Sequence, residues 1–128
     1  MSFVVTISKK YTFDAAHFLT NVPPDHKCAR LHGHTYILEV SLRGPVNNGF
    51  VIDFGDLDAV VKPFIHSYLD HRNLNDVLPP EIPTTVEHLA KFLFETFSPS
   101  LPNLVAIRVW ETPTSWAEYR RDDEGREG

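Results

Sequence analysis

The block from Cys28 to His34 contains the side chains of this chain that are best suited to bind a metal. Side chains alternate between the two faces of an extended backbone, so His32 and His34 would point the same way. A third histidine, His17, lies upstream. Three neutral imidazoles around one point are typical of a catalytic zinc site whose fourth position stays open. The spacing therefore favours Zn²⁺ binding by His17, His32 and His34, and the alternative interpretation is that they are hydrogen-bonded histidines of the surface or core.

Cys28 is the only cysteine, and it lies four positions before His32. The cations Lys27 and Arg30 beside it, together with a nearby metal, would increase the thiolate fraction of this group. Two functional interpretations stay open: a fourth ligand, which would make the zinc structural, or a reactive group beside a catalytic metal. A thiol that only packs as a small apolar group is the third interpretation.

Two further groups of side chains are candidates for chemistry. Adjacent in sequence, Asp70 and His71 can orient each other and exchange a proton. The alternative is a helix C-terminus, at which the helix dipole favours histidine. Glu111, at a predicted strand end, could accept paired hydrogen bonds from a heterocycle edge near Thr84 and Thr85. An exposed edge residue is the alternative interpretation of Glu111.

The hydrophobic pattern predicts the strands that must position these residues. Alternating apolar side chains predict strands over residues 3–13, 35–43 and 104–110, with a fourth candidate over residues 115–120. Prolines and an aspartate interrupt the segment between the first two strands. We therefore expect residues 18–31 to form a loop over one end of the sheet.

Apolar residues at helical spacing predict two helices. The first begins at Asp53 or Asp56, and Pro63 inside it should kink or split it. The second opens at Thr84, which is predicted to form a capping box with Glu87. The order of elements predicts an α+β domain: a four-stranded antiparallel sheet with two helices on one face. We expect residues 1–121 to form this single domain and residues 122–128 to form a polar C-terminal tail.

Composition excludes several classes of function. The net charge of −5 argues against a nucleic-acid partner, and a single cysteine cannot form an internal disulfide. No apolar run approaches the roughly 18–20 residues that span a bilayer. The N-terminus also has no signal-peptide pattern. We therefore expect a cytoplasmic protein whose partners include neither nucleic acid nor membrane.

The motifs resemble those of the 6-pyruvoyltetrahydropterin synthase superfamily and occur in the same order. They comprise His17, the block Cys28–His34, and residues 69–75, 83–87 and 110–112. The resemblance covers about residues 3–119. The gap of three residues between Cys28 and His32 favours the branch that forms 6-carboxy-5,6,7,8-tetrahydropterin in queuosine biosynthesis. The superfamily implies the tunnelling fold (T-fold), in which sheets of several subunits join into a barrel. It also implies a homohexamer of two trimers, with active sites between subunits.

The resemblance implies a role for each candidate residue. His17, His32 and His34 would bind zinc, and Cys28 would act as the general base. Asp70 and His71, from a neighbouring subunit, would complete a proton relay. Glu111 would anchor the pterin ring, with Thr84 and Thr85 nearby.

The implied substrate is 7,8-dihydroneopterin triphosphate, and the implied products are 6-carboxytetrahydropterin, acetaldehyde and triphosphate. Cations that could hold the triphosphate are Lys27, Arg30, Lys9 and Lys10. Two alternatives stay open. One is a 6-pyruvoyltetrahydropterin synthase, which would use the same substrate without carbon–carbon cleavage. The other is a zinc- and pterin-binding protein without turnover.

Overall fold

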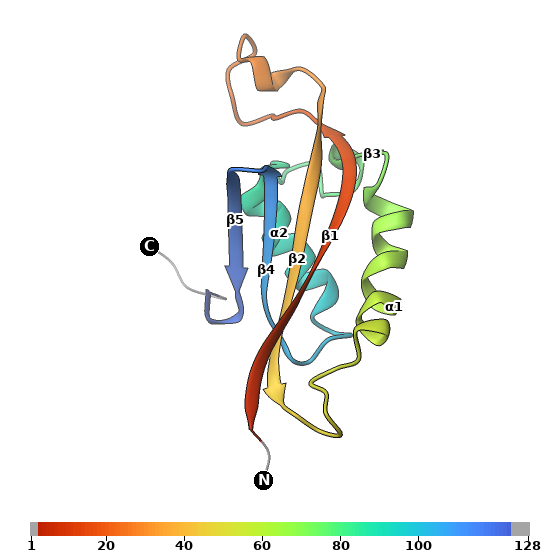
Figure 1. The fold of residues 1–128 in the computed structure, drawn as a ribbon. Coiled ribbons are helices and arrows are strands. Elements are labelled where there is room, and N and C mark those ends of the chain that lie inside the picture. The colour runs from red at the N-terminus through yellow and green to blue at the C-terminus, as the bar shows by residue number, and fades with distance from the viewer. Residues whose placement is uncertain (1–2, 124–128) are drawn as a thin grey trace.

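Five strands form one sheet, which packs against two helices (Figure 1). The computed structural model describes residues 3–123. The strands are β1 (Val4–His17), β2 (His32–Pro45), β3 (Arg72–Asn73), β4 (Leu104–Thr112) and β5 (Ser115–Arg120). Their order in the sheet is β3-β1-β2-β4-β5, and all neighbours are antiparallel except β3 and β1. The α+β class is confirmed, but the prediction of four antiparallel strands is wrong. The parallel strand β3 has two residues, too few to show an alternating pattern.

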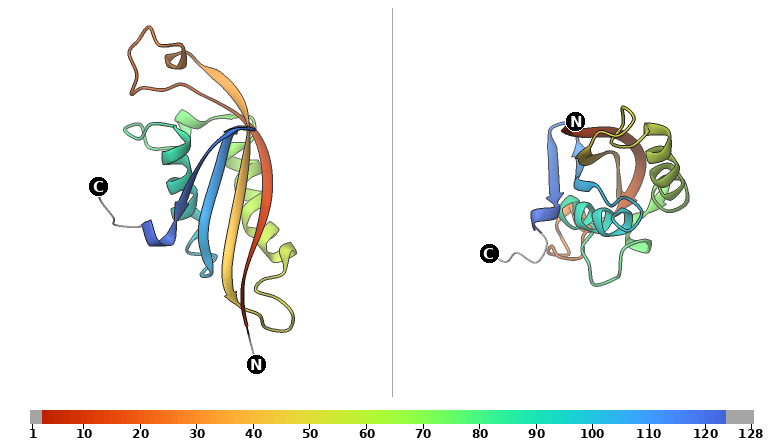
Figure 2. Two further views of the ribbon diagram at one scale, coloured as in Figure 1. Left: turned by 60° about the vertical axis from the view of Figure 1, so that its left-hand side comes forward. Right: turned by 90° about the horizontal axis from the view of Figure 1, so that it is seen from below.

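The hairpin of β1 and β2 is the longest feature of the sheet. Each strand has 14 residues, and the two pair along their whole length, from Val4 opposite Pro45 to His17 opposite His32. Both strands run further than predicted, so the histidines lie within the strands. The segment between them projects beyond the sheet and contains a short 3-10 turn at Lys27–Ala29 (Figure 2).

Alternation along the hairpin is confirmed by burial. Phe13 of β1 and Tyr36, Leu38 and Val40 of β2 are buried, whereas their sequence neighbours face the other side of the sheet. The metal-binding candidates share this parity, since His17, His32 and His34 continue the buried series. The hydrophobic face of the hairpin therefore ends in a set of imidazoles.

Both helices cover the same face of the sheet (Figure 2). Helix α1 (Phe54–Phe64) begins after Asp53, whose side chain accepts a hydrogen bond from the Gly55 backbone N–H. Pro63 lies near its end, and residues 65–69 continue as a π-helix. The predicted break is consistent with this change, because proline contributes no N–H to the helical ladder.

Helix α2 (Val86–Phe97) begins one residue later than predicted. Its N-cap is Thr85, whose hydroxyl accepts a hydrogen bond from the His88 backbone N–H. The predicted capping box of Thr84 and Glu87 is therefore wrong. The Thr84 hydroxyl is buried and lies 3.1 Å from a ring nitrogen of His17 instead.

None of the helices within residues 3–123 is long and apolar enough to cross a membrane. In the predicted polar tail, Asp122 and Asp123 complete a 3-10 turn that begins at Arg121. The rest of that tail lies outside the described residues.

Candidate active site

Three histidines and one glutamate converge at the end of the sheet where the β1–β2 loop begins. One potential ligand atom from each of His17, His32, His34 and Glu111 lies within 4.8 Å of the others. Glu111 reaches the group because β4 pairs with β2, with Trp110 opposite Ile37. The structure thus brings the three predicted metal ligands together and adds a carboxylate to them.

Carbonyl oxygens orient two of the imidazole rings. His17 Nδ1 lies 2.8 Å from the Thr84 carbonyl oxygen, and His32 Nδ1 lies 2.7 Å from the Arg30 carbonyl oxygen. Because a carbonyl only accepts, Nδ1 is the donor in each ring, and the lone pair is on Nε2. Contacts of this kind fix the tautomer and direction of metal-binding histidines.

The donor set fits a divalent metal. Within residues 3–123, Nε2 of His17 and Nε2 of His34 are buried side-chain atoms without a hydrogen-bond partner. Burial lowers the pKa of His17, which favours the neutral imidazole that metals bind. Orphaned nitrogens that converge within 4.8 Å could hold a metal ion, which would give these buried atoms a partner. Three imidazoles with one further oxygen are a donor set that suits zinc.

Glu111 lies against two of these histidines. Its Oε1 is 2.8 Å from His34 Nε2 and 3.9 Å from His17 Nε2. The shorter contact has ion-pair distance but not the direction of a hydrogen bond. The side chain is 31% exposed, so it is neither a free edge residue nor fully buried. Sequence analysis missed this contact because the pairing of β2 with β4 is not visible in either strand's own pattern.

Cys28 lies near the cluster in sequence but is not one of the converging groups found within the described residues. It belongs to the 3-10 turn of the β1–β2 loop and is half-buried. Its backbone carbonyl accepts a hydrogen bond from Leu19, and its backbone N–H donates to His26. The interpretation of Cys28 as a fourth ligand gains no support from this arrangement.

Asp70 and His71 form the expected pair, with 2.8 Å between Asp70 Oδ2 and His71 Nδ1. The hydrogen bond that the Asp70 carboxylate accepts from the His71 ring raises the pKa of His71. The pKa of Asp70 is lowered, mainly because its other oxygen accepts from the Asp14 backbone N–H and then because of His71.

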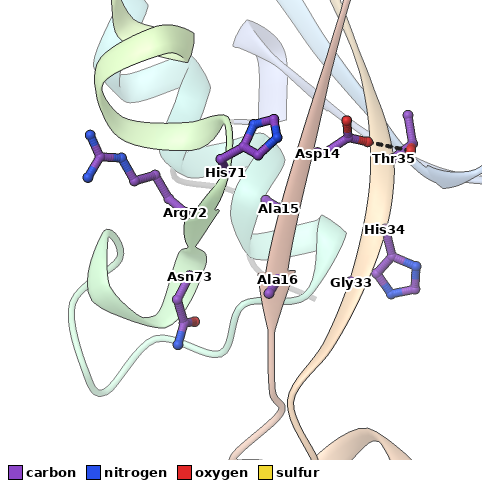
Figure 3. A pocket seen from close by; sticks show the side chains of 9 residues that line it. All are labelled: Asp14, Ala15, Ala16, Gly33, His34, Thr35, His71, Arg72 and Asn73. Atoms are coloured by element: carbon purple, nitrogen blue, oxygen red, sulfur yellow. Dashed lines mark hydrogen bonds between the residues drawn. The ribbon is translucent and has the colours of Figure 1, made fainter.

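The Asp70–His71 pair is not bonded to the histidine cluster of the same chain. Within residues 3–123, no hydrogen bond or ion pair joins Asp70 or His71 to the three histidines. His71 and His34 line the same hollow of about 560 Å³, together with Asp14 and Thr35, whose side chains bond to each other (Figure 3). One chain therefore holds the pair and the cluster as separate groups.

Two of the four candidate cations for the triphosphate already have partners. The ammonium of Lys9 lies 2.8 Å from Asp58, and that of Lys10 lies 4.9 Å from the centre of the Trp110 ring. Lys27 and Arg30 flank Cys28 in the loop. The loop cations are thus the two that lie beside the thiol.

Comparison with known proteins decides the family. A family model described as 6-pyruvoyl tetrahydropterin synthase matches residues 6–122. The chain belongs to this family. It is 35% identical to 6-carboxy-5,6,7,8-tetrahydropterin synthase of Haemophilus influenzae, over 89% of this chain and 97% of that one. It is 32% identical to 6-pyruvoyl tetrahydrobiopterin synthase of Dictyostelium discoideum, over 94% of this chain and 98% of the relative.

Solved structures agree with the assignment. The structure of Caenorhabditis elegans 6-pyruvoyl tetrahydropterin synthase superposes with a TM-score of 0.82 at 28% identity, covering 91% of this chain and 95% of that chain. The chain therefore has the T-fold architecture of the family and is a lyase of the pterin-synthase type. Of the two relatives above, one is named for a carboxy-forming reaction and the other for a pyruvoyl-forming reaction.

Proposed function

We propose that the protein is a zinc-dependent 6-carboxy-5,6,7,8-tetrahydropterin synthase of queuosine biosynthesis. It converts 7,8-dihydroneopterin triphosphate to 6-carboxytetrahydropterin, acetaldehyde and triphosphate. Atom balance adds one water to the substrates. The pterin ring is reduced while a side-chain carbon is oxidised, so no external reductant is needed. The name of the Haemophilus influenzae relative and the short gap between Cys28 and His32 support the carboxy-forming reaction.

The convergence of three histidines, of which His17 and His34 have orphaned Nε2 atoms, carries the proposal. His17, His32 and His34 hold the metal, and the Thr84 and Arg30 carbonyls keep two of the rings aimed at it. A zinc ion bound there supplies Lewis acidity toward an oxygen of the substrate side chain. The histidines themselves stay neutral, which burial favours for His17.

Proton transfer is the task of the remaining residues. The Cys28 thiolate removes a proton from the substrate side chain, and protonated His71 returns one elsewhere. Asp70 favours the protonated form of His71 by raising its pKa and fixes its ring through the 2.8 Å contact. Because no hydrogen bond or ion pair joins the pair to the cluster within the described residues of one chain, it serves the site of a neighbouring subunit. A homohexamer of two trimers satisfies this requirement.

Substrate recognition falls to Glu111, with Thr84 and Thr85 as further substrate-binding candidates. An ionised carboxylate accepts two parallel N–H donors, which the amino-pyrimidine edge of a pterin offers. Lys27 and Arg30, beside Cys28, are the cations proposed to meet the triphosphate.

One reaction tests the proposal against both alternatives. Zinc-loaded protein is incubated with 7,8-dihydroneopterin triphosphate, and the products are analysed by mass. Acetaldehyde together with 6-carboxytetrahydropterin is the expected result. A pyruvoyl product without acetaldehyde would identify the alternative synthase, which similarity to the Dictyostelium discoideum enzyme favours. Bound pterin without any product would identify a binding protein.

A further inference from the structure

Three buried side-chain atoms within residues 3–123 have no hydrogen-bond partner, and all three lie together. Two are the Nε2 atoms of His17 and His34, and the third is the hydroxyl of Tyr36. A metal satisfies the two nitrogens. It leaves the Tyr36 hydroxyl to be explained, because a buried polar group without a partner is costly.

The position of Tyr36 is fixed by its neighbours. It follows His34 by two residues on β2, so both side chains lie on the same face of the sheet. Its ring lies edge-on to the imidazoles of His34 and His17, with centroids 5.6 and 6.1 Å apart. Phe13, its cross-strand partner, stacks on it at 5.1 Å. Tyr36 is 0% exposed, so bulk water does not reach the hydroxyl.

Glu111 is a hydrogen-bond acceptor on the strand next to that of Tyr36. The pairing of Trp110 with Ile37 puts Glu111 beside Tyr36 on the adjacent strand, and the Glu111 charge acts on the phenol. In this structure the carboxylate lies instead 2.8 Å from His34 Nε2. A metal on that nitrogen uses the lone pair and ends the contact with Glu111. The carboxylate then either binds the metal or moves to another donor.

We propose that Tyr36 is a positioning residue of the metal centre: its hydroxyl donates a hydrogen bond to Glu111 and thereby holds the carboxylate off the bound metal. The fourth position then stays open to substrate, and Glu111 stays available to the pterin. Without the hydroxyl, Glu111 closes the site as a fourth ligand. This inference rests on the metal-dependent function proposed above.

Cobalt-substituted protein reports the coordination directly through its visible absorption, and azide probes the open position. In Tyr36→Phe we expect a changed cobalt spectrum and azide affinity weakened roughly tenfold or more, the scale of lost outer-shell contacts. In the double variant Tyr36→Phe, Glu111→Gln, azide affinity should return to the wild-type value. Rescue by the second substitution identifies Glu111 as the blocking ligand.

Tyr11→Phe is the matched control. Tyr11 is also a buried tyrosine of the same sheet, but its hydroxyl bonds Asp58 at 2.7 Å, away from the histidines. This variant should keep the wild-type cobalt spectrum and azide affinity. In the metal-free protein it should unfold at a lower temperature, whereas Tyr36→Phe loses no hydrogen bond and should not.

Three results would overturn the inference. Wild-type azide affinity and spectrum in cobalt-loaded Tyr36→Phe would show that the hydroxyl is only structural and would leave the proposed function intact. A strong gain in azide affinity for Glu111→Gln alone would show that Glu111 already occupies the metal in the native protein. This second result does not depend on the folding of Tyr36→Phe. Failure of the wild type to bind cobalt would overturn the metal-dependent function as well.

Discussion

Nδ1 of His17 lies 2.8 Å from the carbonyl oxygen of Thr84 and 3.1 Å from its hydroxyl, and both residues are buried. The contact joins the end of β1 to the segment just before α2. The same threonine hydroxyl also donates to the Phe18 carbonyl at 3.3 Å. One metal-binding candidate is therefore oriented by a helix start that is distant in sequence.

Thr84→Val should weaken zinc binding. The substitution removes the hydroxyl but keeps the carbonyl, so we expect a loss of about tenfold, the low end for outer-shell partners of metal-bound histidine. Competition with a chromophoric chelator measures this affinity. Thr35→Val is the control, because the Thr35 hydroxyl bonds Asp14 on the other face of the sheet. Equal losses in both variants would contradict an orienting role for Thr84.

Cys28→Ala should keep zinc and lose turnover. The thiol is not among the converging ligand atoms, so metal content by elemental analysis should match the wild type. Loss of a general base typically lowers the rate by about 10²–10⁴-fold. The rate is followed as acetaldehyde release. If zinc content falls in step with activity, Cys28 is a ligand and the proposed mechanism is wrong.

Glu111→Gln should weaken pterin binding without loss of zinc. Glutamine replaces one acceptor by a donor, which opposes one of the two N–H groups of the pterin edge. We expect a loss of about 2–4 kcal/mol, the scale for a buried charged partner left unpaired. Titration of a non-reactive pterin into both proteins gives the difference. Equal affinities would mean that the pterin is anchored elsewhere.

The Asp70–His71 pair should make the stability of the protein depend on pH. The His71 pKa is raised above its ordinary 6.5, chiefly by the hydrogen bond that the imidazole donates to Asp70. Any stability from the pair is therefore fully present below pH 6.5 and is lost as the pH rises through the raised pKa. Asp70→Asn should bring the His71 pKa back toward 6.5, and NMR titration of the imidazole measures this change.

Asp14→Asn is the control for this titration. The Asp14 side chain acts on His71 only through its charge, and weakly, so the His71 pKa should fall less than in Asp70→Asn. A larger fall in Asp14→Asn would mean that the hydrogen bond between Asp70 and His71 is absent in solution.

Thr85→Ala should destabilise the fold. Thr85 is the N-cap of α2, and loss of a threonine cap typically costs about 1 kcal/mol. Denaturant unfolding of the metal-free protein measures the change. Glu87→Ala is a matched test of the rejected capping box and should cost less. A larger loss in Glu87→Ala would restore the capping role that sequence analysis assigned to Thr84 and Glu87.

Periodicity predicted the parts of the fold whose faces differ in polarity. The spacing of His32 and His34 on an alternating strand indicated a shared face, and the structure has both rings with His17. The hydrophobic pattern does not reveal an element that is too short to show a period, such as β3. It also does not reveal which of two possible hydrogen-bond partners a polar side chain has. Thr84 has the residue type and the spacing of a helix N-cap. In the structure, however, its buried hydroxyl contacts His17 and does not cap the helix.

Contacts between neighbouring strands were the second feature that could not be predicted from the sequence. Glu111 reaches His34 only because β4 lies next to β2, and strand order depends on packing of the whole sheet. Tyr36 lies on the alternating apolar face predicted for residues 35–43, and that pattern does not distinguish it from an ordinary core residue. Its unpartnered hydroxyl becomes visible only when every buried atom is placed.

The backbone at His71 decides how kinetic data on this residue should be read. Its φ of 59° lies in the left-handed region, and its N–H donates to the Asp14 carbonyl at 2.6 Å. Alanine is disfavoured there by about 1–2 kcal/mol, whereas asparagine adopts this conformation readily. A rate loss in His71→Ala would therefore mix the missing imidazole with a displaced turn. His71→Asn keeps the turn and isolates the imidazole, so asparagine is the informative replacement in any mutational scan.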